Sequence, residues 1–283
     1  MQLLGDMSTD KDLSGGTLVG EWLVLVSDES RSIILLQALG EDFAHVKTIE
    51  LLHGDKEFDL ECAATDGEFV YVAGSHSAVR KQLPGLIGTV KRQPQRDGVF
   101  RFRLQANGTI SDVEHRSLRA AIDSHEVLAP FAELASKENG IDIEGLAARE
   151  GKLFFGFRGP VLRDNWVPVL VTKFDKPSNR DVRYVQLGGR GIRDLVAVTD
   201  GLLVLAGPVG DGDADYQLWH WNGVCGLREP TKLFCKQLTG LHQPKQVKLE
   251  GMILLGENVR GYELLLLSDG STGGSPQRIV VER

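Results

Sequence analysis

Four acidic residues recur within a repeated phrase and are the strongest candidates for chemistry. They are Glu61 in Asp59-Leu60-Glu61-Cys62, Glu144 in Asp142-Ile143-Glu144-Gly145, Asp194 in Ile192-Arg193-Asp194-Leu195, and Glu250 in Lys248-Leu249-Glu250-Gly251. Converging carboxylates suit hard cations such as calcium or magnesium, which take oxygen ligands. The phrase therefore predicts a divalent-cation site. The alternative is a structural ring in which the carboxylates accept backbone hydrogen bonds and lock neighbouring elements together.

Basic residues and one histidine are expected beside these acids. Arg158 and Arg193 are predicted catalytic groups that stabilise developing negative charge. His76, in Gly74-Ser75-His76-Ser77, is the candidate for general acid/base work. Three further residues are predicted to bind substrate at the same place: Lys248, Asp28 and Asp269. In the alternative interpretation the basic residues only neutralise the acids, and His76 is a hydrogen-bonded loop residue.

The repeat unit that must position these residues has the pattern of a four-stranded antiparallel meander. In the third unit, Glu144–Arg149 and Lys152–Arg158 flank a turn, and Val167–Phe174 and Val182–Leu187 follow as alternating apolar runs. Five such units predict an all-β fold, a propeller of five four-stranded blades around a central channel. The start of a first strand and the end of a second strand lie at the same end of a meander. All the candidate residues are therefore expected around one mouth of the channel.

The spacing of the units also predicts how the ring closes. The equivalent positions, from Ser14 to Glu250, lie 47, 83, 50 and 56 residues apart, and the last 33 residues with the first 14 make up one more unit. We therefore expect Met1–Leu4 to supply the fourth strand of the last blade and cover its edge. The 83-residue interval predicts two insertions on the mouth side, a loop over 75–98 and a helical segment over 118–140. A degenerate sixth blade within this interval is the alternative.

Composition narrows the class of protein. The chain has 283 residues, 42% hydrophobic and 25% charged, which indicates one globular domain over residues 1–283. Its net charge of -7 argues against a nucleic-acid partner. No apolar run is long enough to span a bilayer and no signal region is evident, so we expect no membrane partner and a cytoplasmic location, or a periplasmic one if a signal peptide was removed. Cys62 is expected to be a buried free thiol.

Several phrases together resemble a bacterial family of unknown function whose members are predicted propellers. The matching phrases include Ile143-Glu144-Gly145-Leu146-Ala147, Gly156-Phe157-Arg158-Gly159-Pro160, Gly191-Ile192-Arg193-Asp194-Leu195 and Lys248-Leu249-Glu250-Gly251. The chain is more distantly similar to phytase-like esterase propellers and calcium-dependent lactonase propellers. The first resemblance implies a propeller with no established activity. The propellers of the second resemblance carry Glu-Gly phrases at blade starts and a central metal, so this resemblance implies a metal in the channel.

Two functions are consistent with these patterns. The first is a metal-assisted hydrolase of an ester or phosphoester, in which calcium or another divalent cation polarises the bond and activates water. The second is a non-catalytic propeller that binds a small anionic molecule or a protein on the same face, since a fold does not determine a function. Arginines that are paired with the glutamates would favour the second.

Overall fold

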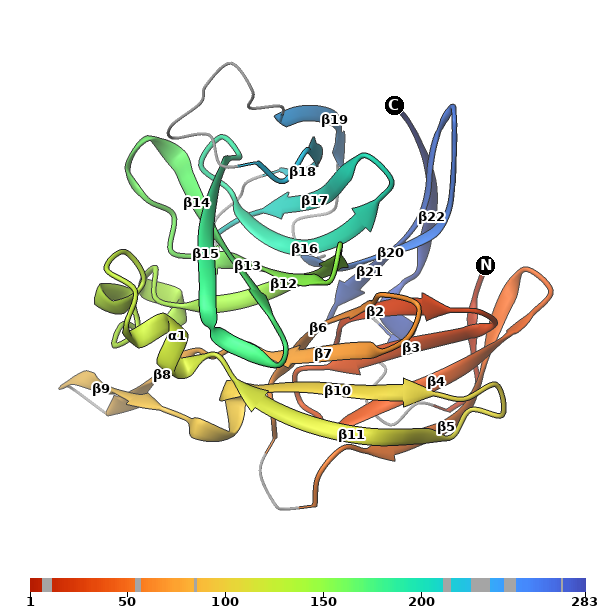
Figure 1. The fold of residues 1–283 in the computed structure, drawn as a ribbon, viewed down its shortest axis with the longest axis horizontal. Coiled ribbons are helices and arrows are strands. Elements are labelled where there is room, and N and C mark those ends of the chain that lie inside the picture. The colour runs from red at the N-terminus through yellow and green to blue at the C-terminus, as the bar shows by residue number, and fades with distance from the viewer. Residues whose placement is uncertain are drawn as a thin grey trace.

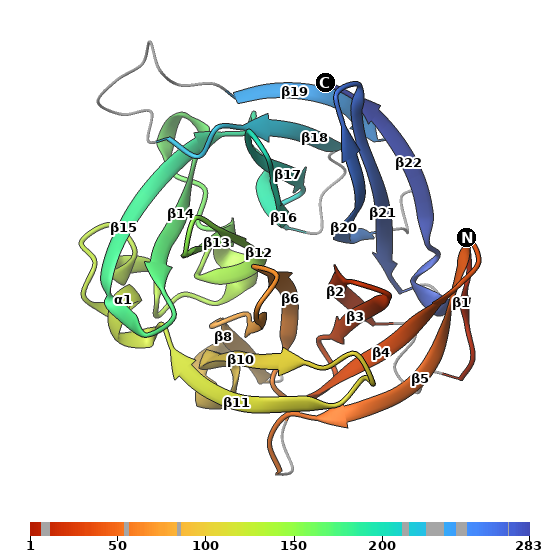
Figure 2. The same ribbon diagram turned by 45° about the vertical axis from the view of Figure 1, so that its right-hand side comes forward.

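The five repeats fold as five small β-sheets arranged in a ring, which is a five-bladed propeller (Figures 1 and 2). The computed structural model describes residues 1–6, 12–53, 57–83, 86–210, 215–224, 235–241, 248–270 and 272–283. Within these ranges the prediction of five blades is confirmed, and the 83-residue interval contains no sixth sheet of the ring.

The first two blades come from the N-terminal part of the chain. The first contains β1 (Leu3–Leu4), β2 (Leu13–Val19), β3 (Trp22–Ser27), β4 (Ser32–Leu39) and β5 (Asp42–Glu50). The second contains β6 (Leu60–Thr65), β7 (Val70–Gly74), β10 (Gly98–Leu104) and β11 (Ile110–Ser117). The first strand of each meander lies next to the channel, as predicted (Figure 2).

The remaining three blades follow in chain order. The third contains β12 (Asp142–Arg149), β13 (Lys152–Gly159), β14 (Trp166–Lys173) and β15 (Lys176–Gln186). The fourth contains β16 (Gly191–Val198), β17 (Gly201–Gly207), β18 (Tyr216–Trp221) and β19 (Cys235–Leu241). The fifth contains β20 (Lys248–Asn258), β21 (Gly261–Asp269) and β22 (Gln277–Glu282).

The expected closure by the N-terminal strand is wrong. β1 pairs in parallel with β5 of the first blade, Leu3 with Phe43 and Leu4 with Ala44. Asp42 fixes this position, because its carboxylate accepts the backbone N–H of Gln2 at 2.7 Å and lies 3.7 Å from the terminal amine. The ring closes instead by side-chain packing, in a hydrophobic cluster that joins the first and last blades.

Both predicted insertions are present and contact each other. Residues 75–98 form a hairpin of β8 (Ala78–Leu83) and β9 (Leu86–Arg92), and the helix α1 (Arg119–Asp123) lies in the second insertion. Ion pairs join the two, from Arg80 to Glu138 at 2.7 Å and from Arg92 to Asp123 at 2.9 Å. α1 has five residues, and no helix among the described residues is long and apolar enough to cross a membrane.

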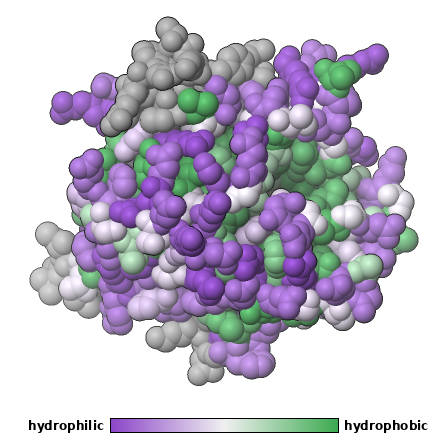
Figure 3. Space-filling view, in the orientation of Figure 1, coloured by the Kyte–Doolittle hydropathy of each residue, from purple (hydrophilic) through white to green (hydrophobic). Residues whose placement is uncertain are grey.

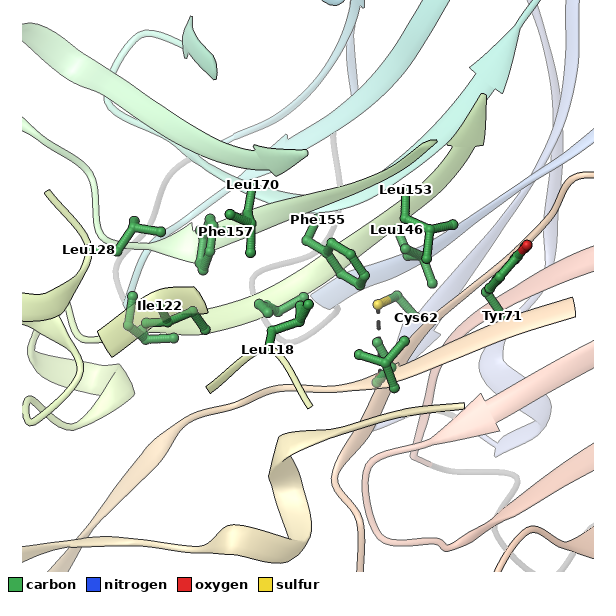
Figure 4. Close-up of a cluster of buried hydrophobic side chains, with 14 of the residues drawn as sticks. Cys62, Tyr71, Leu118, Ile122, Leu128, Leu146, Leu153, Phe155, Phe157 and Leu170 are labelled. Carbon is green, nitrogen blue, oxygen red and sulfur yellow. Dashed lines mark hydrogen bonds between the residues drawn. The ribbon is translucent and has the colours of Figure 1, made fainter. Parts of the chain in front are cut away.

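The hydrophobic core is divided into five clusters, one at each interface between neighbouring blades. Strands that are packed on both faces are almost continuously apolar; every residue of β17, the second strand of the fourth blade, is buried. Figure 4 shows the cluster between the second and third blades, where Phe155 lies near Cys62 and Phe157 lies near Leu128 and Leu170. Leu118 and Ile122 of the helical insertion complete this cluster, which anchors the insertion to the ring. Cys62 is a buried free thiol, as expected.

Candidate functional site

Each of the five inner strands carries a β-bulge at the same place near its start. The register shifts between Leu13 and Gly15, Leu60 and Cys62, Ile143 and Gly145, Ile192 and Asp194, and Leu249 and Gly251. A bulge leaves one residue unpaired and redirects its side chain. These unpaired residues, here called the ring residues, are Ser14, Glu61, Glu144, Arg193 and Glu250. The repeated phrase therefore marks five equivalent positions around one mouth of the channel.

The fourth ring residue is Arg193, whereas the sequence analysis assigned Asp194 to this position. Asp194 is one residue further along, at the position occupied by glycine in three other blades. Its carboxylate accepts the backbone N–H groups of Leu195 and Met252, each at 2.7 Å. Since Met252 belongs to β20, Asp194 joins two inner strands. Both of its oxygens are used in this way, so this geometry gives no support to the prediction that Asp194 is a metal ligand.

The glycine after a ring residue lets neighbouring inner strands approach closely. A Cβ atom on Gly145 would lie 2.8 Å from Cγ2 of Ile192 and 3.1 Å from the backbone nitrogen of Leu195. A Cβ atom on Gly15 would lie 2.6 Å from the carbonyl oxygen of Glu61. The Glu-Gly phrase thus combines a ring residue with a position that has no room for a side chain.

Gly145→Ala is expected to lower the free energy of unfolding by about 1–3 kcal/mol, because the added methyl group overpacks the contact with the fourth blade. Urea denaturation measures this change. Gly256→Ala is the matched control on another inner strand, where the nearest atom would be 3.8 Å away, and it should change stability by less than about 0.5 kcal/mol. Equal effects of the two substitutions would contradict the proposed close approach.

Three of the ring residues form a buried ion-pair chain. Arg193 contacts Glu144, with Nε 3.0 Å from Oε2, and its Nη2 donates to Oε1 of Glu250. Arg158 contacts the other oxygen of Glu144 at 2.9 Å and also pairs with Asp142. The Arg193 side chain is only 4% exposed. Burial raises the pKa of Glu144, and the two guanidinium groups oppose that rise. The predicted residues Glu144, Glu250, Arg158 and Arg193 are therefore together, but they are paired with one another.

Glu61, the ring residue of the second blade, is not part of this ion-pair chain. Among the described residues, the Glu61 carboxylate has no ion pair and no hydrogen bond, although the residue is partly exposed at the mouth. Loss of surrounding water, followed by the charges of Asp59 and Glu144, holds the pKa of Glu61 well above its usual range. Glu61 is therefore a ring carboxylate that makes no direct contact with a basic group of the described chain, although the Arg158 guanidinium is near enough to interact with its charge.

Asp28 is a second acid near this gap. Its backbone N–H donates to Oγ of the ring residue Ser14 at 3.1 Å, while its Oδ1 is buried with no hydrogen-bond partner in the described part of the chain. Burial raises the pKa of Asp28 to about 7, with further contributions from Glu250 and Asp59. Of the other predicted substrate-binding residues, Lys248 pairs with Asp269 at 3.4 Å.

Two acids and an arginine at this mouth were missed by the sequence analysis as site residues. Asp59 accepts hydrogen bonds from Ser75 and from Arg96, the latter at 2.8 Å, and Asp142 pairs with Arg158. Asp59 and Asp142 both lie two residues before a ring glutamate, and this repeated spacing is a signal that the sequence contains. No comparable pattern marks Arg96, which lies in the first insertion.

The general acid/base role predicted for His76 does not fit its surroundings. His76 is fully buried, its Nδ1 lies 2.9 Å from the carbonyl oxygen of Gly74, and its Nε2 accepts the backbone N–H of Leu118 at 3.2 Å. Both ring nitrogens are therefore used to fasten the helical insertion to the end of β7. Among the described residues, His76 makes no hydrogen bond or ion pair with Glu61 or Arg158, so this geometry gives no support to a role beside them.

His76 is expected to titrate near pH 4 in the native protein. Burial lowers its pKa from 6.5 to about 4, because the charged imidazolium loses water that the surroundings do not replace. Since the unfolded chain then binds the proton more tightly, stability should fall as the pH drops from about 6.5 to about 4. Carbon–proton NMR correlation spectra of the histidine rings measure the midpoint. A His76 midpoint near its ordinary value of 6.5 would contradict this assignment.

The residues at the mouth do not fit the divalent cation that the sequence suggested. Asp194 is committed to backbone N–H groups, and a guanidinium group stands between Glu144 and Glu250. Within the described ranges, no three His, Cys, Asp or Glu side chains are placed so that they could hold a metal ion. We therefore derive no metal-dependent step from this site.

The opposite end of the channel has a different character. A cavity of about 130 Å³ lies there between the second halves of the inner strands. Its lining is mostly apolar and includes Leu18, Ala64, Ala148, Val196 and Leu254. Figure 3 shows a hollow with a hydrophobic lining on one face of the molecule, surrounded by hydrophilic side chains. Charged chemistry is thus concentrated at the mouth formed by the ring residues.

Comparisons with solved structures support the fold. The chain is 12% identical to glutaminyl cyclase of Myxococcus xanthus, with a TM-score of 0.51 over 97% of this chain and 91% of that one. It is 11% identical to the PQQ-bound aldose sugar dehydrogenase of Streptomyces coelicolor, with a TM-score of 0.50 over 100% and 96% of the two chains. At these identities the likeness shows the fold alone. No curated protein matches the chain in sequence.

A family model covers nearly all of the ring described above. It matches residues 12–96 and 89–279, which include all five ring residues and both insertions. The resemblance to a family of unknown function is thereby confirmed. The chain belongs to the family described as "Protein of unknown function (DUF3616)".

Proposed function

We propose that this propeller is a non-catalytic binding domain that holds the cationic group of a ligand beside Glu61. The observation that carries the proposal is the state of the Glu61 carboxylate, which has no ion pair or hydrogen bond among the described residues. Glu61 occupies one of the five ring positions, and the glutamates at two other ring positions, Glu144 and Glu250, are neutralised by arginine. A cation placed there would remove the electrostatic penalty that now raises the pKa of Glu61.

A guanidinium or ammonium group fits this gap better than the small anionic molecule expected from the sequence. The basic residues Arg158 and Arg193 already contact carboxylates, and Glu61 is further surrounded by Asp59 and Asp142. An anion would meet unneutralised acids in this gap. Arg193 also illustrates how the ring holds a guanidinium group, between two glutamates of different blades. The ligand is either a small guanidine or amine, or an Arg or Lys side chain of a protein.

The hydrolase interpretation receives less support from this geometry. It requires free arginines for the anionic group, an accessible proton shuttle and a metal-binding set of carboxylates. Arg158 and Arg193 are paired, and His76 is buried with both ring nitrogens bonded to backbone. A binding function needs none of these groups to be free.

Calorimetric titration with butylguanidine, and with its neutral isostere butylurea, tests the proposal. We expect butylguanidine to bind the native protein and butylurea to bind at least about tenfold more weakly, because only the first forms a charge-assisted bond to Glu61. Glu61→Gln should weaken butylguanidine binding by a factor of about ten or more. Glu21→Gln, an exposed glutamate in the turn between β2 and β3, is the matched control and should leave binding unchanged.

The same titration has a defined dependence on pH. Because the pKa of Glu61 is raised, protons compete with the guanidinium group for this carboxylate at a higher pH than they would for an ordinary glutamate, and binding should strengthen as the pH rises. Equal binding of butylguanidine and butylurea, or equal binding by the native protein and Glu61→Gln, would refute the proposal. Calcium binding that is abolished by Glu61→Gln, without any guanidine binding, would instead support the metal site.

A further inference from the structure

The fifth blade has an open edge where every other blade has another strand. Three of the other sheets have four strands and the first has five, whereas β20, β21 and β22 form a sheet of three. β22 pairs with β21 from Gln277 to Glu282, and no described strand pairs with its other side. Figures 1 and 2 both show β22 at the outside of the ring. A row of backbone donors and acceptors is therefore available for a further strand.

The side chains of β22 do not protect this edge. Exposed edges are usually blocked by charged residues or proline within the strand. The outer strand β15 has Pro177 and several charges, but the centre of β22 is Ile279-Val280-Val281. The two most exposed large hydrophobic side chains in the described chain also belong to this blade: Val259 at 89% and Val280 at 77%. β-branched residues favour strand pairing, so the edge is suited to accept a strand.

The charges of β22 indicate which strand it accepts. Arg278 and Glu282 lie two residues on either side of Val280. When two copies of β22 pair antiparallel about Val280, Arg278 of each copy lies directly opposite Glu282 of the other. Ile279 of each copy then lies opposite Val281 of the other, and Val280 lies opposite itself. Opposite charges and β-branched residues are both favourable as directly opposed pairs.

We propose that two copies of this chain associate through β22, in antiparallel register about Val280. Both copies contribute the same strand to this contact, and a two-fold axis relates them. The contact therefore forms a closed dimer and cannot add further copies to make a fibre. The two three-stranded sheets become one six-stranded sheet, and both open edges are covered. Arg278 can join the contact while it pairs with Glu263 through Nε, because its guanidinium group has further donors.

Sedimentation equilibrium of charge-reversed variants tests the dimer and its register. The native chain should form a dimer, and Arg278→Glu and Glu282→Arg should each weaken it at least about tenfold, since each places like charges opposite each other twice. An equimolar mixture of the two variants should recover a dimer close to native affinity, because in the mixed dimer every Glu faces an Arg. Glu150→Arg, on an exposed turn of the third blade, should have no effect.

Hydrogen exchange of the β22 amides gives a second readout that does not depend on a substitution. Protection of these amides should increase with protein concentration as the dimer forms. The proposal would be overturned by a native chain that stays monomeric at about 100 μM, a concentration well above the dissociation constants of stable dimers. A native dimer that neither reversal weakens, or a mixture of the variants that stays monomeric, would overturn the register.

Discussion

Replacing Arg193 with methionine is expected to lower the free energy of unfolding by about 3–5 kcal/mol, because it leaves two buried glutamates without their shared cation. The Arg193 side chain is 4% exposed and contacts Glu144 and Glu250. Methionine keeps much of the length of the side chain, so lost packing contributes little. Urea denaturation at pH 8 measures the effect. It should be smaller at pH 5, where Glu144 and Glu250 can take up protons in the variant.

A surface arginine provides the comparison for this result. Arg116 pairs with Glu114 at 3.2 Å and its side chain is 40% exposed. Arg116→Met should therefore cost at most about 1 kcal/mol, since exposed ion pairs contribute little. If Arg193→Met were no more harmful than Arg116→Met, the ion-pair chain would not hold the three blades together as described.

Replacing Asp194 with alanine is expected to lower the free energy of unfolding by about 2–5 kcal/mol. The substitution leaves the backbone N–H groups of Leu195 and Met252 buried without their acceptor, and each such group costs about 1–3 kcal/mol. Thermal and urea denaturation both measure the change. The effect follows from the role of Asp194 as a link between inner strands, and it requires no ligand.

Butylguanidine binding separates this structural role from a ligand-binding one. Asp194→Ala should leave the affinity of the folded protein within about threefold of native, since both oxygens of Asp194 are bonded to backbone N–H groups of Leu195 and Met252. Asp181→Ala, an exposed carboxylate on β15, serves as the control for stability and should change it by less than about 0.5 kcal/mol. A stable Asp194→Ala protein that had lost ligand binding would show that Asp194 belongs to the ligand site.

The strands and their order could be predicted because both depend on local, repeated patterns. The four strands predicted for the third unit are found as β12, β13, β14 and β15. Apolar alternation and turn residues determine these elements within a few residues of sequence. The two insertions were recognised for a related reason, since they interrupt a regular spacing.

The sequence pattern led to Asp194 as the fourth ring residue because acidic residues of different repeats were matched by residue type. Matching them by position in the repeat gives Arg193. Without a gap, Ile192-Arg193-Asp194-Leu195 aligns with Ile143-Glu144-Gly145-Leu146, which places Arg193 on Glu144 and Asp194 on Gly145. The bulges confirm this alignment. Because one ring position carries arginine where others carry glutamate, Arg193 neutralises two of the ring glutamates, Glu144 and Glu250.

Other features depend on contacts between distant segments, and no local pattern reports them. His76 was placed beside the arginines because it follows a strand that ends at the mouth, but a bond to Leu118 holds it within the insertion. The N-terminal strand was assigned to the last blade by counting residues, but Asp42 attracts it to the first. In both cases a polar group on another segment determines where the residue lies.

The most direct test of the proposed function is a crystal structure of the protein with bound butylguanidine. The guanidinium group is expected within hydrogen-bond distance of the Glu61 carboxylate, on the side of Asp28. Arg193 should remain between Glu144 and Glu250, as it is without ligand. A guanidinium group bound away from the ring residues, or one that displaces Arg193 from its two glutamates while Glu61 stays unpaired, would contradict the account.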